Sequence, residues 1–435
     1  MALTESLITK AITEVLKHAA PKKRGGICAN LRRDSSMGKI LSLSPKGVTM
    51  KKSAWLEQDD DWEVLMTFLP SGWQAKAKEL GALLRCRVFD SAENLLRTLL
   101  IHLAEGCSLR ETAVRARHGD IVSVSDVALL KRLNASGEWF RWMAVGVMQR
   151  WIEKQPEVIF GQSIRIRLID GSTIQEPGST GSTWRLHYSI GLTSLRCDEV
   201  YVTTPQEGES FERFKVEPGD LFIGDRNFGR RPDVKHVVQA GGQVLVRINL
   251  TNLPLTNKDG KRFALLNRLR TLSRTRLGDW EVWVPYENAS IPGRVCALKK
   301  SKEAAEKAQR KVLQENSKKG AKVRPETIEA AAYTFVFTTL DRSFTPATIL
   351  EIYRGRWQIE LAFKRLKSII ALGHLRKADL EGAKAWLHGK LLVAFLIEAM
   401  INAGERFFPW GYPIIQELPK ASLYLERDIA YASST

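Results

Sequence analysis

Apolar residues follow two different periods along this chain. Between residues 62 and 152 they recur at helical spacing, as in Leu95, Leu99 and Leu103, which predicts a set of helices. From about Ile164 onward, short segments alternate apolar and polar residues or are apolar throughout. That pattern is typical of strands, so the chain is expected to begin with helices and continue with a sheet.

Segment 160–249 combines strands with a helix. Strand patterns are present in SIRIRLIDGSTI, TWRLHYSIGL, DEVYVTT, DLFIGD and QVLVRI, SFERFKV suggests a short helix, and PDVKHVVQAGG has the pattern of a helix that ends at glycine. Several strands followed by a strand–helix–strand unit predict an α/β fold, with a mixed sheet and flanking helices.

The pattern of apolar and polar residues changes between residues 250 and 332. DWEVWVPYE and RVCALKK are strand-like, and SKEAAEKAQRKVLQENSKKGAKVR is a charged helix with a basic end. We therefore expect a β-rich insertion that carries a basic helix. The core pattern returns with the strand YTFVFTTL, one helix from Pro346 to about Ile370 and another over AKAWLHGKLLVAFLIEAMINA. The predicted segments are a basic N-terminal segment (1–60), a helical domain (61–155), the first part of the core (160–249), the insertion (250–332), the second part of the core (333–405) and a C-terminal tail (406–435).

Two short helices within 61–155 have the layout of a DNA-binding motif. Ser108 opens SLRETAVRAR, and Glu111 follows three residues later, which predicts a capping box. A second helix, DVALLKRL, follows after HGDIVSVS. Helix, short turn and basic helix are compatible with a helix-turn-helix DNA reader, and a plain helical bundle fits the pattern equally well.

The charge balance favours a polyanionic partner. The 435 residues include 66 Lys and Arg against 48 Asp and Glu, a formal net charge of +18. Such an excess favours nucleic acid, through phosphate contacts and counterion release. An anionic membrane is an alternative without an obvious amphipathic anchor, and a solubilising surface charge is the plainer one.

Several features bear on the compartment. No run of about 18 apolar residues is present, and the start of the chain lacks the order of a signal peptide. We expect a cytoplasmic protein with no membrane partner. The five cysteines are scattered, without a C-x-x-C pair, so neither structural disulfides nor a cysteine zinc site is expected. They are Cys28, Cys86, Cys107, Cys197 and Cys296.

Two aspartates end apolar strands. Asp170 follows the apolar residues of LIDGST, and Asp225 ends DLFIGD. Asp-Gly after a strand usually forms a turn, so Asp170 alone carries little weight. Functional groups nevertheless gather at strand ends in α/β sheets. Two carboxylates side by side there repel each other unless a cation lies between them, and Mg²⁺ prefers oxygen ligands.

A helix near the C-terminus supplies a third carboxylate. Tyr353, Glu360 and Lys367 are seven residues apart, and Arg356 lies between the first two. The four therefore share one edge of a helix, although an Arg356–Glu360 surface ion pair is the simpler interpretation for an isolated helix. The buried stripe of this helix is expected to be Ile349, Ile352, Ile359, Phe363, Leu366 and Ile370.

Taken together, the acids predict metal-ion catalysis. Asp170, Asp225 and Glu360 can hold two Mg²⁺ ions, for which Mn²⁺ can substitute, about 4 Å apart. One ion activates a water or a 3′-hydroxyl, and the other stabilises the leaving 3′-oxygen. The Tyr, Arg and Lys beside Glu360 would then bind phosphates flanking the cut.

At these residues the sequence resembles the DDE transposases of bacterial insertion sequences, and specifically insertion-sequence family four. Tyr353, Arg356, Glu360 and Lys367 match the Y-R-E-K signature of that family at every spacing. LIDGST and GDRNF match the two Asp blocks, with Asn227 where many relatives have Gly, a small departure because Asn tolerates unusual backbone angles. The resemblance covers roughly residues 160–400.

The resemblance implies an RNase H-like core, with the Asp residues on two strands and the Glu on a helix. It implies a β-rich insertion between Asp225 and Glu360, which are 360 − 225 = 135 residues apart here. It also implies double-stranded DNA as partner, both the terminal inverted repeats of the element and the target, and a homodimer in the DNA complex.

The aromatic residues that the family uses are matched less well in this chain. Relatives release DNA through a hairpin intermediate, with an aromatic from the insertion holding a flipped base. The strand before the signature helix has Tyr333 and Phe335 but no Trp, and Trp280 and Trp283 lie on opposite faces of their strand, where core packing is the simpler role. Trp357 matches the R-W pair of the family and is a candidate DNA contact, with bracing of the helix as the alternative.

Two further features carry less weight. A single His on a strand is usually structural, and two-metal chemistry needs no such base, so His187 is left out of the site. Between Lys299 and Arg324 many basic residues follow one another. Part of this run is expected to follow a phosphate backbone, and a solvated helix is the alternative.

The sequence thus predicts a cut-and-paste transposase, bacterial and nucleoid-associated. A non-catalytic DNA-binding protein, such as an inactive relative acting as a repressor, would not need the three acids. A simple metal nuclease would leave the Y-R-E-K block unexplained.

Overall fold

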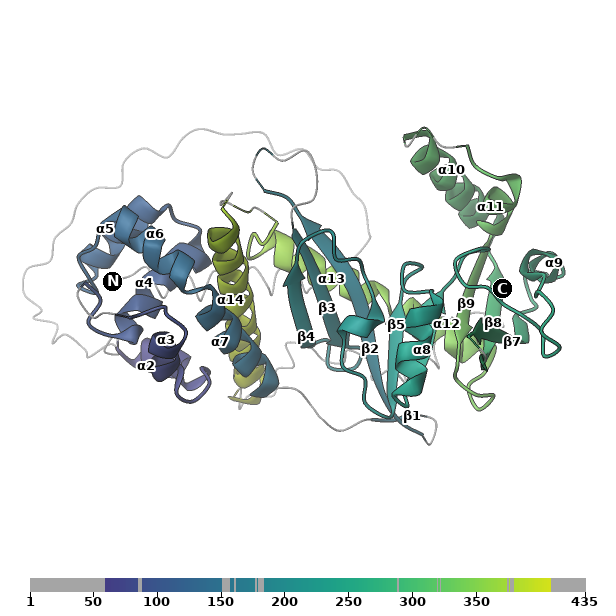
Figure 1. The fold of residues 1–435 in the computed structure, drawn as a ribbon, viewed down its shortest axis with the longest axis horizontal. Helices are drawn as coiled ribbons and strands as arrows, with labels where there is room; N and C mark the ends of the chain where they lie inside the picture. The colour runs from purple at the N-terminus through teal and green to yellow at the C-terminus, as the bar shows by residue number, and fades with distance from the viewer. Residues whose placement is uncertain are drawn as a thin grey trace, which may run out of the picture.

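The computed structural model describes residues 59–407 apart from 85–87, 151–156, 160–161, 177, 179–183, 288, 319, 321, 374 and 376–378. The predicted basic N-terminal segment, except its last two residues, and the predicted C-terminal tail, except residues 406–407, lie outside the described residues, as do Cys28 and Cys86. The predicted α/β architecture is present as a mixed sheet with helices on both faces (Figure 1).

One sheet runs through the molecule in the order β4-β3-β2-β5-β6-β9-β8-β7, and β1 pairs with β2 outside this path. The pairs β2–β3 and β3–β4 are antiparallel, whereas β5 is parallel to both β2 and β6. The pairs joining β6, β9, β8 and β7 are all antiparallel. The strands are β1 (Glu157–Ile159), β2 (Gln162–Ile174), β3 (Trp184–Gly191), β4 (Cys197–Thr203), β5 (Asp220–Gly224), β6 (Gln243–Arg247), β7 (Gly278–Tyr286), β8 (Ala289–Lys299) and β9 (Tyr333–Thr338).

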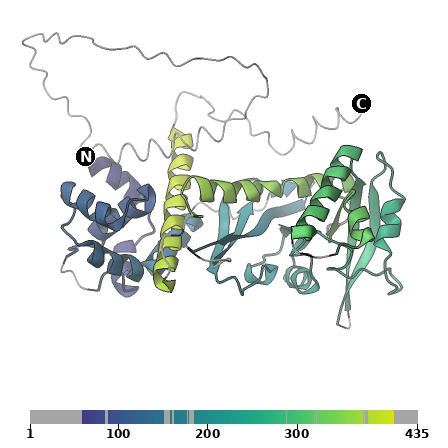
Figure 2. The same cartoon turned by 90° about the horizontal axis from the view of Figure 1, so that it is seen from above.

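Helices cover the two faces of this sheet and give each face its own core. Because side chains alternate along a strand, Leu168 and Ile223 lie in a core with α13, whereas Ile169 and Phe222 lie in a second core with α8. We call these the α13 face and the α8 face. Figure 2 shows α12 and α13 running along the sheet, with α14 crossing their end. The helices from β4 onward are η1 (Phe211–Arg213), α8 (Arg231–Gln239), α9 (Leu265–Arg270), α10 (Lys302–Lys318), α11 (Pro325–Ala330), α12 (Pro346–Arg354), α13 (Trp357–Ser368) and α14 (Leu380–Phe407).

The single helix predicted from Pro346 to Ile370 is in fact α12 and α13, with a tighter turn between them. In that turn the backbone N–H of Arg356 donates to Tyr353 O at 3.0 Å. Leu192 packs so closely against Gly355 that a Cβ there would lie 3.0 Å from Leu192 Cδ1. Glycine is a poor helix former. The helical segment therefore changes geometry at Gly355, where the missing side chain leaves space for Leu192. The predicted stripe is otherwise confirmed, since all six residues are buried or packed against the core.

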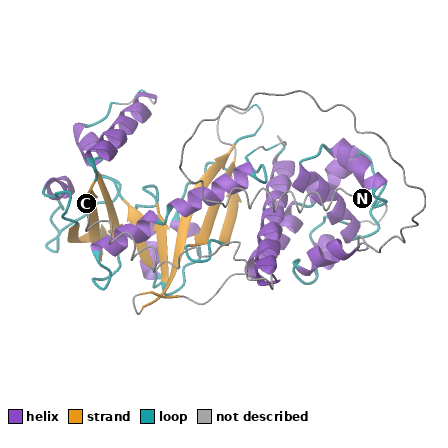
Figure 3. Ribbon diagram, turned by 180° about the vertical axis from the view of Figure 1, so that it is seen from behind, coloured by secondary structure: helices purple, strands orange, loops and turns teal. Residues whose placement is uncertain are grey.

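The N-terminal helices pack against α14, from the other end of the chain. Glycine allows this close approach on both sides. A Cβ on Gly389 of α14 would lie 2.6 Å from Leu103 Cδ1, and one on Gly137 would lie 3.3 Å from Ala385 Cα. Figure 3 shows this helical part beside the sheet. Its helices are α2 (Asp59–Thr67), α3 (Trp73–Glu79), α4 (Ala92–Glu105), α5 (Leu109–His118), α6 (Asp126–Ala135) and α7 (Gly137–Arg150).

Helices α5 and α6 form the predicted helix, turn and helix. Ser108 Oγ accepts a hydrogen bond from Glu111 N at 3.1 Å, and Ser125 Oγ caps α6 in the same way. Only half of the predicted capping box forms, because the Glu111 carboxylate pairs with Arg115 at 2.6 Å. Arg115, one turn later, gives Glu111 a charge-assisted hydrogen bond, which is stronger than a hydrogen bond to a backbone N–H.

By length and composition, residues 380–403 of α14 could cross a membrane. In the structure 72% of the apolar window within this segment is buried inside the protein. The apolar character of α14 is therefore used in the packing against the N-terminal helices and the sheet.

The residues between β6 and β9 add strands to the same sheet and helices beyond it. β7 and β8 form a hairpin that continues the sheet next to β9. α10 and α11 project away from the sheet (Figure 1), and α10 has no buried residue. The stretch predicted as an insertion thus contains both strands and the basic helix that its sequence indicated.

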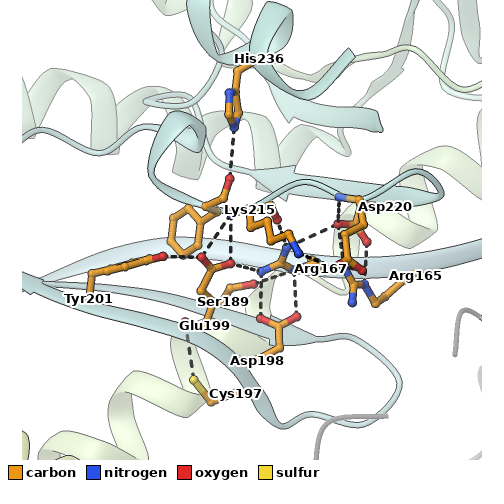
Figure 4. A network of polar contacts seen from close by, with 12 residues as sticks. Arg165, Arg167, Ser189, Cys197, Asp198, Glu199, Tyr201, Lys215, Asp220 and His236 are labelled. Atoms are coloured by element: carbon orange, nitrogen blue, oxygen red, sulfur yellow. Dashed lines mark hydrogen bonds and ion pairs between the residues drawn. The ribbon is translucent and has the colours of Figure 1, made fainter. Parts of the chain in front are cut away.

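A buried ion network holds β2 in register on the α8 face (Figure 4). Arg167, only 3% exposed, donates to Asp198 and Glu199 of β4 and pairs with Asp220 of β5. A buried guanidinium is tolerated only when its donors are satisfied by well-placed acceptors. Because this one joins three strands, it anchors β2 three residues before Asp170.

Candidate active site

Asp170 and Asp225 lie side by side where β5 ends. Leu168 of β2 is opposite Ile223 of the parallel strand β5, and the same register places Asp170 opposite Asp225. Since alternate residues share a face, both carboxylates are on the α13 face. Backbone pairing therefore brings together two acids that are 55 residues apart (225 − 170) in the sequence.

Asp170 does not end its strand, contrary to the expectation from LIDGST. β2 continues to Ile174, because β3 pairs with it past this point: Asp170 is opposite Tyr188 and Ile174 is opposite Trp184. Only the parallel neighbour β5 stops here, so the sheet opens on that side alone. The Asp-Gly dipeptide forms no turn, and the backbone N–H of Gly171 donates to Asp170 Oδ1 at 2.8 Å.

Arg356 joins the third carboxylate to the first. Its Nη1 donates to Asp170 Oδ2 at 3.3 Å, and its Nη2 donates to Glu360. Helix α13 lies against β2, which carries Glu360 to the strand-end site. The Glu360 side chain is 59% exposed, against 16% for that of Asp170, so it forms the outer side of the site.

The environment of Asp170 favours its neutral form when no metal is bound. Burial raises the pKa of the Asp170 carboxyl to about 7, and the charges of Asp225 and Glu209 act in the same direction. The N–H of Gly171 and the charge of Arg356 oppose this shift. Such crowding of acids in a partly buried position is typical of a functional site that binds a cation.

The remaining signature residues surround this group. Tyr353 is partly buried, and burial raises its pKa, while the nearby charges of Arg356 and Arg247 lower it. Lys367 Nζ donates to the carbonyl of Thr173 at 3.1 Å, near the end of β2. Trp357 is 49% exposed. The structure thus brings Tyr353 next to the acids, while Lys367 lies toward the far end of α13 and Trp357 is the exposed first residue of that helix.

Arg247 is a site residue that the sequence prediction missed. Gly224 of β5 is opposite Val246 of β6, so the register places Arg247 beside Asp225. Close to it, burial and the charges of Arg247 and Arg226 lower the pKa of Lys300 to about 8. QVLVRI shows an arginine at a strand end, but only the register reveals which residue it adjoins. Arg247, Arg226 and Lys300 thus lie close together, and three neighbouring cations favour an anionic ligand.

Glu209 was missed as well. Its carboxylate lies directly on Gly171, since a Cβ at that glycine would be 2.5 Å from Glu209 Oε1. Glu209 precedes η1 in a connection whose sequence, PQEGESFERF, has no strand or helix period. No pattern in the sequence marks it as a partner of Asp170.

His187 and Trp280 have the structural roles expected of them, whereas Trp283 is partly exposed and belongs to neither core. His187 is 1% exposed, its Nε2 lies 2.8 Å from Thr203 Oγ1, and burial lowers its pKa to about 4. Trp280 packs against the core of the α8 face, with its ring 6.4 Å from that of Phe263. Tyr333 and Phe335 are buried in the same core, so neither is free to hold a base.

The donor set fits a hard divalent cation in kind. Three carboxylates gather at one edge of the sheet, and oxygen is the ligand that Mg²⁺ prefers. Within the described part of the chain, no three His, Cys, Asp or Glu side chains already surround a common metal position. The geometry explains this, because the guanidinium of Arg356 contacts both Asp170 and Glu360 and supplies the positive charge itself.

Comparison with known proteins gives the class of protein. Residues 204–396 match the family described as "Transposase DDE domain", a match that includes Asp225 and Glu360 and begins after Asp170. The chain is therefore that of a DDE transposase, an enzyme class that acts on DNA.

Relatives that match most of the chain identify the group of DDE transposases more closely. The putative transposase InsL for insertion sequence element IS186A of Escherichia coli (strain K12) is 33% identical over 359 residues, which cover 80% of this chain and 96% of the relative. The transposase for insertion sequence element IS421 of Escherichia coli is 33% identical over 360 residues, with the same coverage. The transposase for IS231F of Bacillus thuringiensis subsp. israelensis is 24% identical over 200 residues, 42% of this chain and 41% of the relative. This chain belongs to the insertion-sequence transposases of the DDE type, in insertion-sequence family four.

Proposed function

We propose that this transposase excises its element and inserts it into target DNA by Mg²⁺-dependent cleavage and strand transfer, with Asp170, Asp225 and Glu360 as the catalytic acids. One observation carries the proposal. The register of β2 and β5 sets the two aspartates side by side on the α13 face, and Arg356 joins Glu360 to the first of them.

The topology supports an RNase H-like core. Counted from β2, three antiparallel strands are followed by the two parallel strands β5 and β6, in the spatial order β4-β3-β2-β5-β6. The first and fourth of these strands carry the aspartates, and a helix across the sheet carries the glutamate. This is the arrangement that the resemblance to DDE transposases implies.

The three acids would hold two Mg²⁺ ions, with Mn²⁺ as a substitute, which supply activation of the attacking oxygen and stabilisation of the leaving one. Asp170 and Asp225 hold fixed positions because they lie on or directly after paired strands. Glu360 is more exposed and sits on a helix, so it closes the site from outside. Arg356 has to release both carboxylates as the site fills.

Several cations are placed to hold the DNA. Once released, Arg356 can bind a phosphate with its fork of N–H donors. Arg247 and Lys300 lie on the opposite side of Asp225, and no described carboxylate forms an ion pair with either. Tyr353 of α12, and Lys367 and the exposed Trp357 of α13, continue this surface. A strand of DNA would thus be held on both sides of the acids.

Binding of the terminal inverted repeats is assigned to the N-terminal helices. α5 and α6 have the layout of a helix-turn-helix reader, with Arg110 and Lys131 exposed. The exposed basic side chains of α10, such as Lys307 and Arg310, are placed to follow a phosphate backbone. A homodimer would bring two element ends together.

The test uses purified protein and DNA that includes the sequences flanking its gene. Asp225→Ala should still bind this DNA in a gel-shift assay and should fail to nick it with Mg²⁺. Asp259→Ala, which changes an exposed carboxylate in a turn between β6 and α9, should nick as well as the unchanged protein. Normal nicking by Asp225→Ala would reject the assignment of the acids.

A further inference from the structure

Glu209 lies against β2 at Gly171, the residue after Asp170. A Cβ at Gly171 would be 2.5 Å from Glu209 Oε1 and 2.8 Å from its Cγ. Glycine at 171 therefore leaves the space that the Glu209 side chain occupies. Since alternate residues of β2 share a face, this contact lies on the α8 face, and Glu209 reaches the end of β2 from the side opposite the Asp170 carboxylate. Glu209 lies outside the set of three acids that the signature blocks contain.

The same carboxylate also holds the turn that carries Asp225. Asn227 Nδ2 donates to Glu209 Oε2 at 2.8 Å. The backbone N–H of Asn227 donates to Asp225 Oδ1 at 2.7 Å. Glu209 and Asp225 are thus linked through one asparagine, which fixes the direction of the Asp225 carboxylate.

A fully buried acid, Asp233 of α8, clamps this connection in place. Asp233 Oδ1 accepts from Ser210 Oγ at 2.7 Å and from Phe211 N at 2.6 Å. Its Oδ2 accepts from Arg230 Nε at 2.8 Å, and Arg230 also donates to the carbonyl of Glu209. The residue after Ser210 is Phe211, a core aromatic, so the backbone from Glu209 to Phe211 is held.

The Glu209 side chain is partly exposed and accepts a hydrogen bond from Asn227. Among the described residues Glu209 forms no ion pair with Lys or Arg. Asp170 and Asp225, which lie close by, are themselves acids. Like charges this close together repel one another. Crowded carboxylates of this kind are stabilised by a cation, and partners in the outer shell of a metal orient its ligands.

We propose that Glu209 is a fourth acid of the catalytic site: it positions the Asp225 turn through Asn227 and adds the negative charge that draws divalent cations to Asp170 and Asp225. The inference rests on the proposed function. It assigns Glu209 as a positioning residue that acts on the metal site, distinct from the three acids of the DDE set.

The charge and the hydrogen bond can be separated by two substitutions. Glu209→Gln keeps an oxygen that accepts from Asn227 but removes the charge, whereas Glu209→Ala removes both. Loss of an outer-shell partner typically costs about 10–100-fold in metal affinity. We expect Glu209→Gln to weaken Mn²⁺ binding by roughly tenfold, measured as free Mn²⁺ by electron paramagnetic resonance on the protein–DNA complex. The Mg²⁺ concentration for half-maximal nicking should rise in parallel, with little change at saturating Mg²⁺.

Glu209→Ala should lower nicking even at saturating Mg²⁺, since Asn227 loses its partner. The matched control is Glu207→Gln, two residues earlier, where the carboxylate pairs with Arg213 at 2.9 Å. It should leave Mn²⁺ binding unchanged. Mn²⁺ affinity of Glu209→Gln equal to that of the unchanged protein would overturn the inference.

Gly171→Ala provides an independent test, because its methyl group would displace the Glu209 carboxylate. It should reproduce the Mn²⁺ defect of Glu209→Ala, and it should add nothing in a Glu209→Ala background, since residues in contact are not additive. Additive defects would contradict the contact. Asp225→Ala separates the two proposals: if that variant loses nicking while Glu209→Gln binds Mn²⁺ normally, only the inference on Glu209 fails.

Discussion

Arg356 is a single side chain that contacts two acids of the site at once. It is 17% exposed and lies between Asp170 and Glu360, where a divalent cation would compete with it. Hydrogen bonds to charged groups contribute about 1.5–3 kcal/mol each, so under the proposed function the guanidinium would oppose metal binding until DNA offered it a phosphate. The proposed function thus implies that metal binding and DNA binding are coupled through Arg356.

Replacing Arg356 should therefore have opposite effects on metal binding and on cleavage. Arg356→Gln is expected to raise the Mn²⁺ affinity of the DNA-free protein by roughly tenfold, because the competing cation is lost. Nicking of DNA should fall, since the phosphate contact is lost too. Free Mn²⁺ measured by electron paramagnetic resonance gives the affinity, and plasmid nicking gives the activity.

Lys364→Gln is the control for this change. It removes the same charge one turn after Glu360, from an exposed position on α13. An equal gain in Mn²⁺ affinity in both variants would show that general charge, and not the bridge to Asp170, opposes the metal.

At the scale of elements, α14 is the helix that joins the sheet to the N-terminal helices. It packs against α4, α6 and α7 and also carries Glu398 toward the sheet. Burial raises the pKa of the Glu398 carboxyl to about 7, against the opposing charges of Arg365 and Arg196. The folded protein therefore holds a proton at Glu398 that the unfolded chain releases at lower pH.

This predicts a pH dependence of stability. Between the usual glutamate pKa of 4.5 and the raised pKa of about 7, the folded state binds more protons than the unfolded state, so Glu398 lowers the free energy of unfolding as pH rises through that window. Glu398→Gln should melt at nearly the same temperature as the unchanged protein near pH 4 and at a higher one at pH 8. The measurement is thermal unfolding by circular dichroism without metal.

Glu381→Gln serves as the matched control on the same helix, because its carboxylate is 68% exposed. It should shift the melting temperature little at either pH. If Glu398→Gln gains nothing at pH 8, the carboxyl is solvated and α14 does not bury it in solution.

At the scale of the molecule, charge is distributed to suit a long polyanion. The net charge is +18, and exposed basic side chains occur on α5, α6 and α10 as well as around the acids. A protein that covers several phosphates releases counterions, and its affinity then depends steeply on salt.

Binding to a duplex from the element end should weaken steeply between about 50 and 200 mM salt, by roughly 10³–10⁵-fold if 6–10 phosphates are contacted. Fluorescence anisotropy at several salt concentrations gives the slope. Replacing Lys307 and Arg310 of α10 by Gln should reduce that slope by about two, near one unit per phosphate. An unchanged slope would place α10 off the DNA.

Local sequence by itself determined the elements and the signature. Strand period 2 and helix period 3.6 are local properties, so β5, β6, α8 and the buried stripe of α12 and α13 could be predicted from their own residues. The spacing of Tyr353, Arg356, Glu360 and Lys367 is likewise a property of one helical segment.

Only the tertiary structure decided which distant residues meet. Strand register depends on partners far away in the chain, and it placed Asp170 inside β2, beside Asp225, with Arg247 next in the row. Glu209 reached Gly171 through an irregular connection, and α14 returned to the N-terminal helices. These contacts have no local period, because they arise from the packing of segments that are separated by tens to hundreds of residues.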